Sequence, residues 1–70
     1  MRKDTAMRRL RKTRTLSQAD MARVLDISQQ TYSKYESGLL QPPPEMQAHI
    51  AAVLGTSIDA LWPTPQEALQ

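Results

Sequence analysis

The sequence predicts a compact all-α domain of five short helices. Residues 17–38 indicate two short helices joined by a tight turn. Residues 43–54 place apolar side chains at the i, i+4, i+7 and i+8 spacing of one helix face. Ser, Pro and Gly stand where these helices would begin and end. Seventy residues are enough for one domain with a small core.

The N-terminal segment predicts a basic arm followed by a helix. Residues 1–4 are expected to form a flexible arm, and the first helix is expected to begin at residue 4 or 5 and end at residue 12 or 13. Ala6, Met7 and Leu10 mark its apolar side, while its basic side chains point outward. Leu16 is expected to turn inward before the next helix.

The second helix has a clear start and a clear end. Ser17 can cap it, with Asp20 three residues later bonding back to the cap. Met21, Ala22 and Leu25 then form an apolar face. The pattern breaks at Asp26, because Asp tolerates the left-handed conformation that a sharp helix exit needs.

The third helix follows at once. Ile27 is an apolar turn residue, and Ser28 can cap the helix. Tyr32 and Tyr35 share one face and are expected to pack in the core. Gly38 is a natural C-terminal stop.

Proline and glycine define the last two helices. The fourth helix is expected to begin near Pro43 or Pro44, since proline suits the first helical position, and to end at Gly55. Ser57 can cap a fifth helix over residues 58–62, and residues 63–70 are expected to be a tail.

Charge divides the chain into a basic and an acidic part. Residues 1–40 hold all nine Lys and Arg with four acids, a net charge of +5, whereas residues 41–70 have a net charge of −3. A solvated helix face would explain the basic part simply, but a polyanion partner on one side explains both parts.

Several classes of function have no support. The chain has no Cys, and a lone His49 cannot build a metal cluster. We find no constellation of catalytic side chains, no cofactor motif, no small-molecule site and no apolar run that could serve as a signal peptide or membrane span. These features predict a soluble, cytoplasmic protein that is not an enzyme and needs no cofactor.

Gln18 opens the motif, Ala22 is the small residue where its two helices meet, Ile27 is the apolar turn residue, and residues 35–38 close it with Tyr-Glu-Ser-Gly. In these positions the chain resembles the helix-turn-helix of the lambdoid phage repressor and Cro family, also called the xenobiotic-response-element family. The resemblance places a lambda-repressor-like domain at residues 5–62 and its helix-turn-helix at residues 18–37. It implies binding to double-stranded DNA by a homodimer. The matching positions are Leu10, Arg11, Gln18, Ala22, Ile27, Tyr35, Glu36, Ser37, Gly38, Ile50, Ala51, Leu54, Gly55, Ser57, Asp59 and Leu61.

One position and one loop depart from the family, and one pair of residues agrees with it. Asp26 stands where the family usually has Gly, and residues 39–41, Leu-Leu-Gln, replace a loop that is basic in many relatives. The two leucines could pack on a partner or fold back on the core. The family also implies an ion pair between Arg11 and Glu36, with a mainly architectural role.

The third helix carries the candidate base contacts. Helical spacing puts Gln29, Gln30, Ser33 and Lys34 opposite the two tyrosines. Gln can bond adenine N6 and N7 together, and Lys can donate to guanine. Elsewhere these would be ordinary surface amides, but in a helix-turn-helix this face enters the major groove.

Three further residues are candidate phosphate contacts. Gln18 lies at the start of the second helix, where unpaired N–H groups favour an anion. Ser28 is a second candidate, although its capping role competes, and Arg14 is the third. Such contacts carry affinity and salt dependence rather than sequence choice.

The candidate dimer interface lies in the fifth helix. Ile58, Leu61 and Trp62 are large apolar residues near the end of the domain, where family members often pair. Trp62 could instead be a lid on the core, and Leu61 is expected to be mainly core. Aromatic residues are enriched at interface centres, which favours Trp62 as the anchor.

The sequence therefore predicts a sequence-specific DNA-binding transcriptional regulator, expected to be a repressor, that acts as a dimer on a two-fold operator. Two other functions stay open: an antitoxin that also binds a toxin protein, and a protein-interaction module with weak DNA binding. Leu39, Leu40 and the acidic tail suggest the antitoxin, and the missing loop cations suggest the protein-interaction module.

Overall fold

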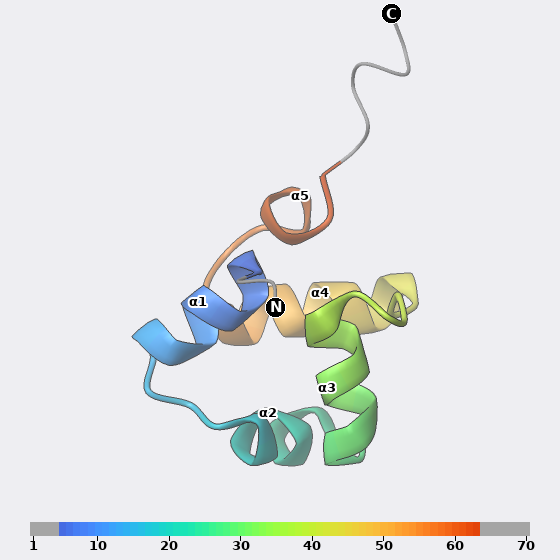
Figure 1. Cartoon of the computed structure of the whole chain (residues 1–70). Coiled ribbons are helices and arrows are strands. Elements are labelled where there is room, and N and C mark those ends of the chain that lie inside the picture. Colours follow the sequence, from blue (N-terminus) through green and yellow to red (C-terminus); the bar gives the residue numbers. More distant parts are fainter. Residues whose placement is uncertain (1–4, 64–70) are drawn as a thin grey trace, which may run out of the picture.

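The computed structural model describes residues 5–63 and confirms the all-α fold (Figure 1). Within these residues there are five helices and no strand. They are α1 (Ala6–Thr13), α2 (Gln18–Leu25), α3 (Gln29–Ser37), α4 (Pro44–Leu54) and α5 (Ile58–Leu61). No helix of the described chain is long and apolar enough to cross a membrane.

The helix starts follow the predicted caps. Ser17 and Asp20 form a capping box, in which Asp20 N–H donates to Ser17 Oγ at 3.0 Å and Ser17 N–H donates to Asp20 Oδ2 at 2.9 Å. Ser28 and Ser57 cap α3 and α5. Pro43 precedes α4 without a side-chain cap.

Three helices end in the same way. Asp26, Gly38 and Gly55 adopt the left-handed conformation, with φ of 59°, 86° and 70°. The N–H of the next residue then donates to a carbonyl five positions earlier, as Ile27 does to Ala22 at 3.0 Å. This pattern closes the last turn of each helix and satisfies its terminal carbonyl groups.

Asp26→Gly is expected to raise the free energy of unfolding by about 0.5 kcal/mol. A left-handed Asp costs up to about 1–2 kcal/mol, which exceeds the roughly 0.5–1 kcal/mol that Gly loses through its freer unfolded chain. Asp26→Ala should instead destabilise, because Ala lacks the polar group that eases this conformation. Urea unfolding of the three proteins should give midpoints in the order Gly, Asp, Ala, and a lower midpoint for Gly would contradict the account.

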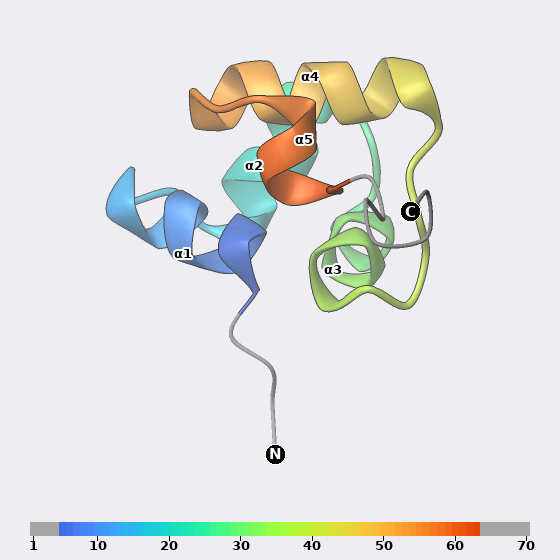
Figure 2. The ribbon, with the colours of Figure 1, turned by 90° about the horizontal axis from the view of Figure 1, so that it is seen from above.

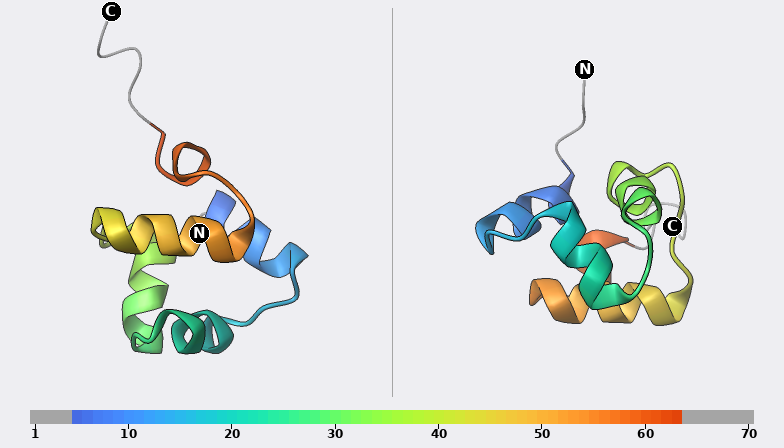
Figure 3. Two further views of the ribbon diagram at one scale, coloured as in Figure 1. Left: turned by 180° about the vertical axis from the view of Figure 1, so that it is seen from behind. Right: turned by 90° about the horizontal axis from the view of Figure 1, so that it is seen from below.

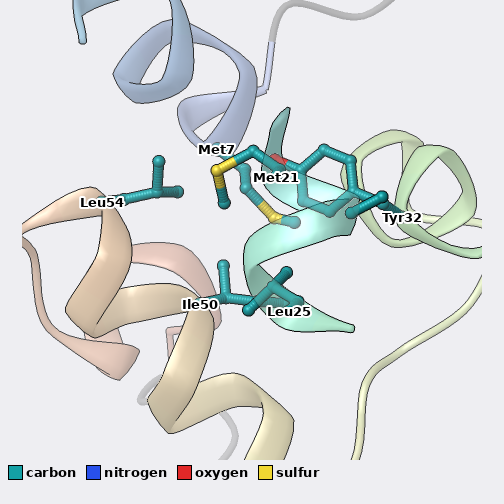
Figure 4. Close-up of a cluster of buried hydrophobic side chains, with 7 residues drawn as sticks. Met7, Met21, Leu25, Tyr32, Ile50 and Leu54 are labelled. Carbon is teal, nitrogen blue, oxygen red and sulfur yellow. The ribbon is translucent and has the colours of Figure 1, made fainter. Parts of the chain in front are cut away.

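The core is assembled from four helices. Met7 of α1, Met21 and Leu25 of α2, Tyr32 of α3, and Ile50 and Leu54 of α4 are buried and converge in Figure 4. Around them pack partly buried side chains, among them Leu16, Met46 and Val53. The inward turn of Leu16 and the apolar stripe of α4 are therefore confirmed.

The helices pack around this core, and α4 contacts both α1 and α2. α2 packs against α3 and α4, while α1 packs against α4 and α5. Figure 2 shows α4 running along one side of the molecule, and Figure 3 shows α3 standing across the end of α2. One side of α3 is thereby left uncovered by other helices.

Some predicted boundaries differ from the observed ones by a residue or two. α1 begins at Ala6, because Thr5 is extended and accepts a hydrogen bond from Arg8 N–H at 3.2 Å. α5 ends at Leu61 rather than at Trp62, whose φ of −130° is not helical. The predicted arm at residues 1–4 and residues 64–70 of the predicted tail lie outside the described residues.

Candidate nucleic-acid interface

The outer face of α3 carries four polar residues that the sequence predicts as base contacts. Gln29, Gln30 and Lys34 are exposed there, and Ser33 is half-buried. On the opposite face Tyr32 is fully buried. Gln29 and Gln30 occupy the first two helical positions, so they stand at the end of α3 that a helix-turn-helix presents to base edges.

The hydroxyl of Ser28 is used in capping α3. Its Oγ accepts from Thr31 N–H at 3.1 Å and donates to Thr31 Oγ1 at 2.8 Å. A phosphate needs a hydrogen-bond donor, and in this arrangement the hydroxyl proton is already used.

A buried ion pair holds α1 to the far end of α3. Arg11 Nε donates to Glu36 Oε2 at 2.7 Å and its NH2 donates to Oε1 at 3.2 Å. The residues are only 8% and 5% exposed. Arg11 NH1 also donates to the Leu16 carbonyl at 2.7 Å. The pair implied by the family resemblance is therefore present, and it also fixes the linker before α2.

Gln18 joins this cluster, which the sequence reasoning missed. Its Nε2 donates to Glu36 Oε1 at 2.9 Å. Three elements therefore meet at one carboxylate: α1 through Arg11, α2 through Gln18 and α3 through Glu36. One amide N–H of Gln18 is used in this bond, which leaves its second side-chain N–H and the unpaired N–H groups of the first turn for an anion.

Protonation of Glu36 is controlled by this cluster. Burial alone would raise the pKa of its carboxyl, but the hydrogen bonds from Arg11 and Gln18 outweigh that effect and hold the pKa below its usual value. The bond to Glu36 in turn raises the pKa of Arg11. The ionised pair is thus the stable form at neutral pH.

Beside the pair, Tyr32 has a buried hydroxyl that makes no hydrogen bond of standard geometry within residues 5–63, although it lies close enough to Glu36 and Arg11 to interact with their charges. Burial raises the pKa of this phenol well above its ordinary value. An unsatisfied buried hydroxyl costs free energy relative to an apolar group of similar shape.

Tyr32→Phe is therefore expected to leave the free energy of unfolding unchanged or raise it by up to about 1 kcal/mol. Phe keeps the ring that fills the core and removes only the unpartnered oxygen. Thermal and urea unfolding would measure the change. A loss of more than about 1 kcal/mol would show that the hydroxyl makes a hydrogen bond in solution, for instance through a trapped water.

Arg14 contacts the end of α4. Its Nε donates to the Leu54 carbonyl at the end of α4, at 2.9 Å. The guanidinium covers Gly55 so closely that a Cβ at this position would overlap it. Arg14, the residue that follows α1, therefore caps α4. Arg14 is still exposed, so its contact with a phosphate stays a prediction.

The candidate dimer residues differ in exposure. Ile58 is 37% exposed, whereas Leu61 and Trp62 are half-buried and pack against the core cluster. Trp62 thus has one side on the core and another toward solvent, which agrees with either a lid or an interface.

Leu39 and Leu40 follow α3 and face solvent. They are 80% and 46% exposed, and neither packs against the core cluster. Of the two alternatives for this loop, folding back on the core is wrong. Val24 on α2 is also exposed.

The described residues contain no group of three His, Cys, Asp or Glu side chains that could hold a metal ion. What these residues offer a ligand is an exposed polar face of α3, on a helix that buried contacts hold in place. The helix-turn-helix of residues 18–37 provides this face, and the Arg11–Glu36–Gln18 cluster fixes its angle to α1 and α2.

Comparison with known protein families gives one result that covers most of the chain. The Helix-turn-helix family model matches residues 7–61, from α1 to the end of α5. Comparison with curated proteins and with solved structures finds no significant match. This family consists of DNA-binding regulatory domains and is not enzymatic. The chain belongs to the Cro/C1-type helix-turn-helix family of DNA-binding transcriptional regulators.

Proposed function

We propose that this protein is a sequence-specific repressor that binds a two-fold symmetric operator as a homodimer. The observation that carries the proposal is the outer face of α3, where Gln29, Gln30 and Lys34 stand exposed on a helix anchored by buried side chains. A dimer would present two such helices to half-sites about one helical turn apart. Bound at a promoter, it would block transcription.

The contacts divide by role. Gln29 and Gln30 bond the edges of adenines in the major groove, Lys34 donates to a guanine or a nearby phosphate, and Ser33 makes a shorter-range contact from its half-buried position. Gln18 and the unpaired N–H groups at the start of α2 hold a phosphate. Ser28 contributes mainly by capping α3, and Arg14 by capping α4.

The dimer is proposed to pair through α5 and the residue after it, with Ile58 and Trp62 at the centre and Leu61 supporting them from the core side. Large apolar side chains that are partly exposed at one end of a small domain suit such an interface.

Trp62→Ala is expected to weaken dimerisation at least about tenfold, or about 1.4 kcal/mol, and to lower folding stability by less. Aromatic anchors dominate interface energies, while only part of this ring is in the core. Sedimentation would measure the dimer, and melts at several concentrations would measure the fold. A fold that collapses independently of concentration would instead assign Trp62 to the core.

A selection of bound duplexes from a random pool, repeated at low and moderate salt, tests the proposed function. Recovery of a two-fold site with half-sites one turn apart would support the dimeric regulator and identify its operator. Binding without sequence preference that disappears with modest salt would show that only general electrostatics is at work, and would overturn the proposal.

Leu39 and Leu40 favour a second candidate function. Two adjacent, exposed leucines in a loop without cations suit contact with a protein rather than with phosphate. An antitoxin that binds both DNA and a toxin would have this feature, as would a protein-interaction module with weak DNA binding. A short toxin-like reading frame beside the gene, and co-purification of its product, would favour the antitoxin.

A further inference from the structure

The cations of this domain are concentrated on α1 rather than on α3. Of the seven Lys and Arg residues within residues 5–63, four lie on α1, and Lys34 is the one that lies on α3. No Lys or Arg follows Lys34 in the chain. Because phosphate contacts supply most of the salt-dependent affinity for DNA, a DNA-binding surface limited to α3 would be poor in charge.

Several of these cations already have partners. Arg11 is paired with Glu36, Arg14 is bound to the Leu54 carbonyl, and Arg23 NH1 lies 3.4 Å from Asp20 Oδ1. The charged groups of Arg8 and Lys12 have no ion-pair partner within residues 5–63, and α1 contains no acidic residue. Within residues 5–63, the half-buried Arg8 and the exposed Lys12 are therefore, with Lys34, the cations that we expect to be available to an external anion.

Helix geometry gives the direction of Arg8 and Lys12. At about 100° per residue, they lie roughly 60° and 100° around α1 from Arg11, in the same sense, with Met7 and Leu10 on the other side. Met7 and Leu10 pack on the core. Arg8 and Lys12 are therefore on the flank of α1 that is next to Arg11 and turned away from the core contacts.

This flank adjoins the start of α2. Arg11 bonds the carbonyl of Leu16, the residue before the cap of α2, and shares Glu36 with Gln18 at the first position of α2. Figures 1 and 2 show the short linker that connects the end of α1 to the start of α2. The flank of α1 thus continues the surface on which the unpaired N–H groups of α2 are available for phosphate.

We propose that Arg8 and Lys12 form a phosphate-binding surface on α1, which engages the DNA backbone beside the half-site contacted by α3. The inference rests on the proposed DNA-binding function and adds a second, sequence-independent region of contact. Two cations at i and i+4 lie about 6 Å apart at Cβ, and their long side chains reach neighbouring phosphates on one strand. This surface replaces charge that the loop at residues 39–41 does not supply.

The salt dependence of binding tests the proposal. The slope of log K against log salt falls by about 0.9 for each lost phosphate contact, so Arg8→Gln/Lys12→Gln should flatten it by about 1.8. Affinity at 0.1 M salt should then fall about 60-fold, equally on the selected duplex and on random duplex. Lys12→Gln alone should flatten the slope by about 0.9. Arg23→Gln is its control, since it removes one exposed charge that is paired within α2, and it should leave the slope unchanged.

Tethered cleavage would locate the contact directly. The chain has no Cys, so one introduced Cys can carry an iron chelate that cuts nearby DNA backbone. Thr13→Cys on the exposed side of α1 should cut at positions flanking the half-site, whereas Ala52→Cys on the exposed side of α4 should not cut.

The proposal is overturned if the double variant keeps the wild-type slope, or if Thr13→Cys cuts no better than Ala52→Cys. Failure of the proposed function has a different signature. A wild-type protein that binds selected and random duplexes equally would refute sequence-specific regulation, while a slope that is flattened by the double variant would still place α1 on the phosphate backbone.

Discussion

Glu36→Ala is expected to lower the free energy of unfolding by about 3–5 kcal/mol, because it leaves the buried Arg11 guanidinium without its counter-ion. The substitution also removes the acceptor of Gln18, so the contacts among α1, α2 and α3 are lost together. A domain of 70 residues has a total stability of roughly 4–10 kcal/mol. Circular dichroism at 37 °C should therefore show a substantial unfolded population.

Two further variants test whether the loss of stability comes from the unpaired buried charge. Arg11→Met/Glu36→Leu should recover most of the stability, since apolar residues of similar volume often replace a buried ion pair without loss. Arg23→Ala breaks the exposed pair with Asp20 and should cost at most about 0.5 kcal/mol. If Glu36→Ala were as mild as Arg23→Ala, the buried geometry would not persist in solution.

The same pair predicts how stability depends on pH. The pKa of Glu36 in the folded protein is below its ordinary value of 4.5, so its contribution is complete above that value and is lost as the pH falls through the lower folded pKa. Lowering the pH from 7 to 3 should therefore reduce the free energy of unfolding of the wild type more than that of Arg11→Met/Glu36→Leu. Urea unfolding at each pH measures both. Parallel pH profiles would show that Glu36 titrates alike in both states.

Local chemistry made the helix boundaries predictable. Ser17, Ser28 and Ser57 cap the helices that they precede, and Asp26 and Gly38 end theirs, because each residue type has a backbone preference that acts over a few positions. Tight periodicity likewise predicted the buried face of α4. Thr15, at φ 56°, was not predictable in this way, since a β-branched residue rarely adopts this conformation.

The partners of the long polar side chains were not predictable from the same rules. Arg14 bonds a carbonyl forty positions away, and Gln18 bonds a carboxylate eighteen positions away. Arg and Gln fit many acceptors, so the acceptor within reach depends on how the helices pack. The Arg11–Glu36 pair was expected because of the family resemblance alone. The outer face of α3 was easier to predict. Once Tyr32 is assigned to the core, helix periodicity shows which side chains are exposed.

Gln29→Ala is expected to reduce affinity for the selected operator by about 1–3 kcal/mol, or roughly 5–150-fold. Binding to random duplex should change less than about twofold, because non-specific binding is electrostatic and Gln carries no charge. Gln29 is exposed at the first position of α3, and it does not contribute to the buried core, so folding should be unaffected. Fluorescence anisotropy with both duplexes measures the specificity ratio.

Gln41→Ala is the matched control, because it truncates another exposed glutamine outside α3. Any phosphate contact that Gln41 makes would affect both duplexes equally and leave the ratio unchanged. A sharper test replaces the contacted adenine by 7-deazaadenine, which lacks the N7 acceptor. The wild type should lose affinity on the modified operator, while Gln29→Ala should lose little more, since the same hydrogen bond is already absent. Equal losses by both proteins would mean that Gln29 does not contact that base and that α3 recognises the operator through other side chains.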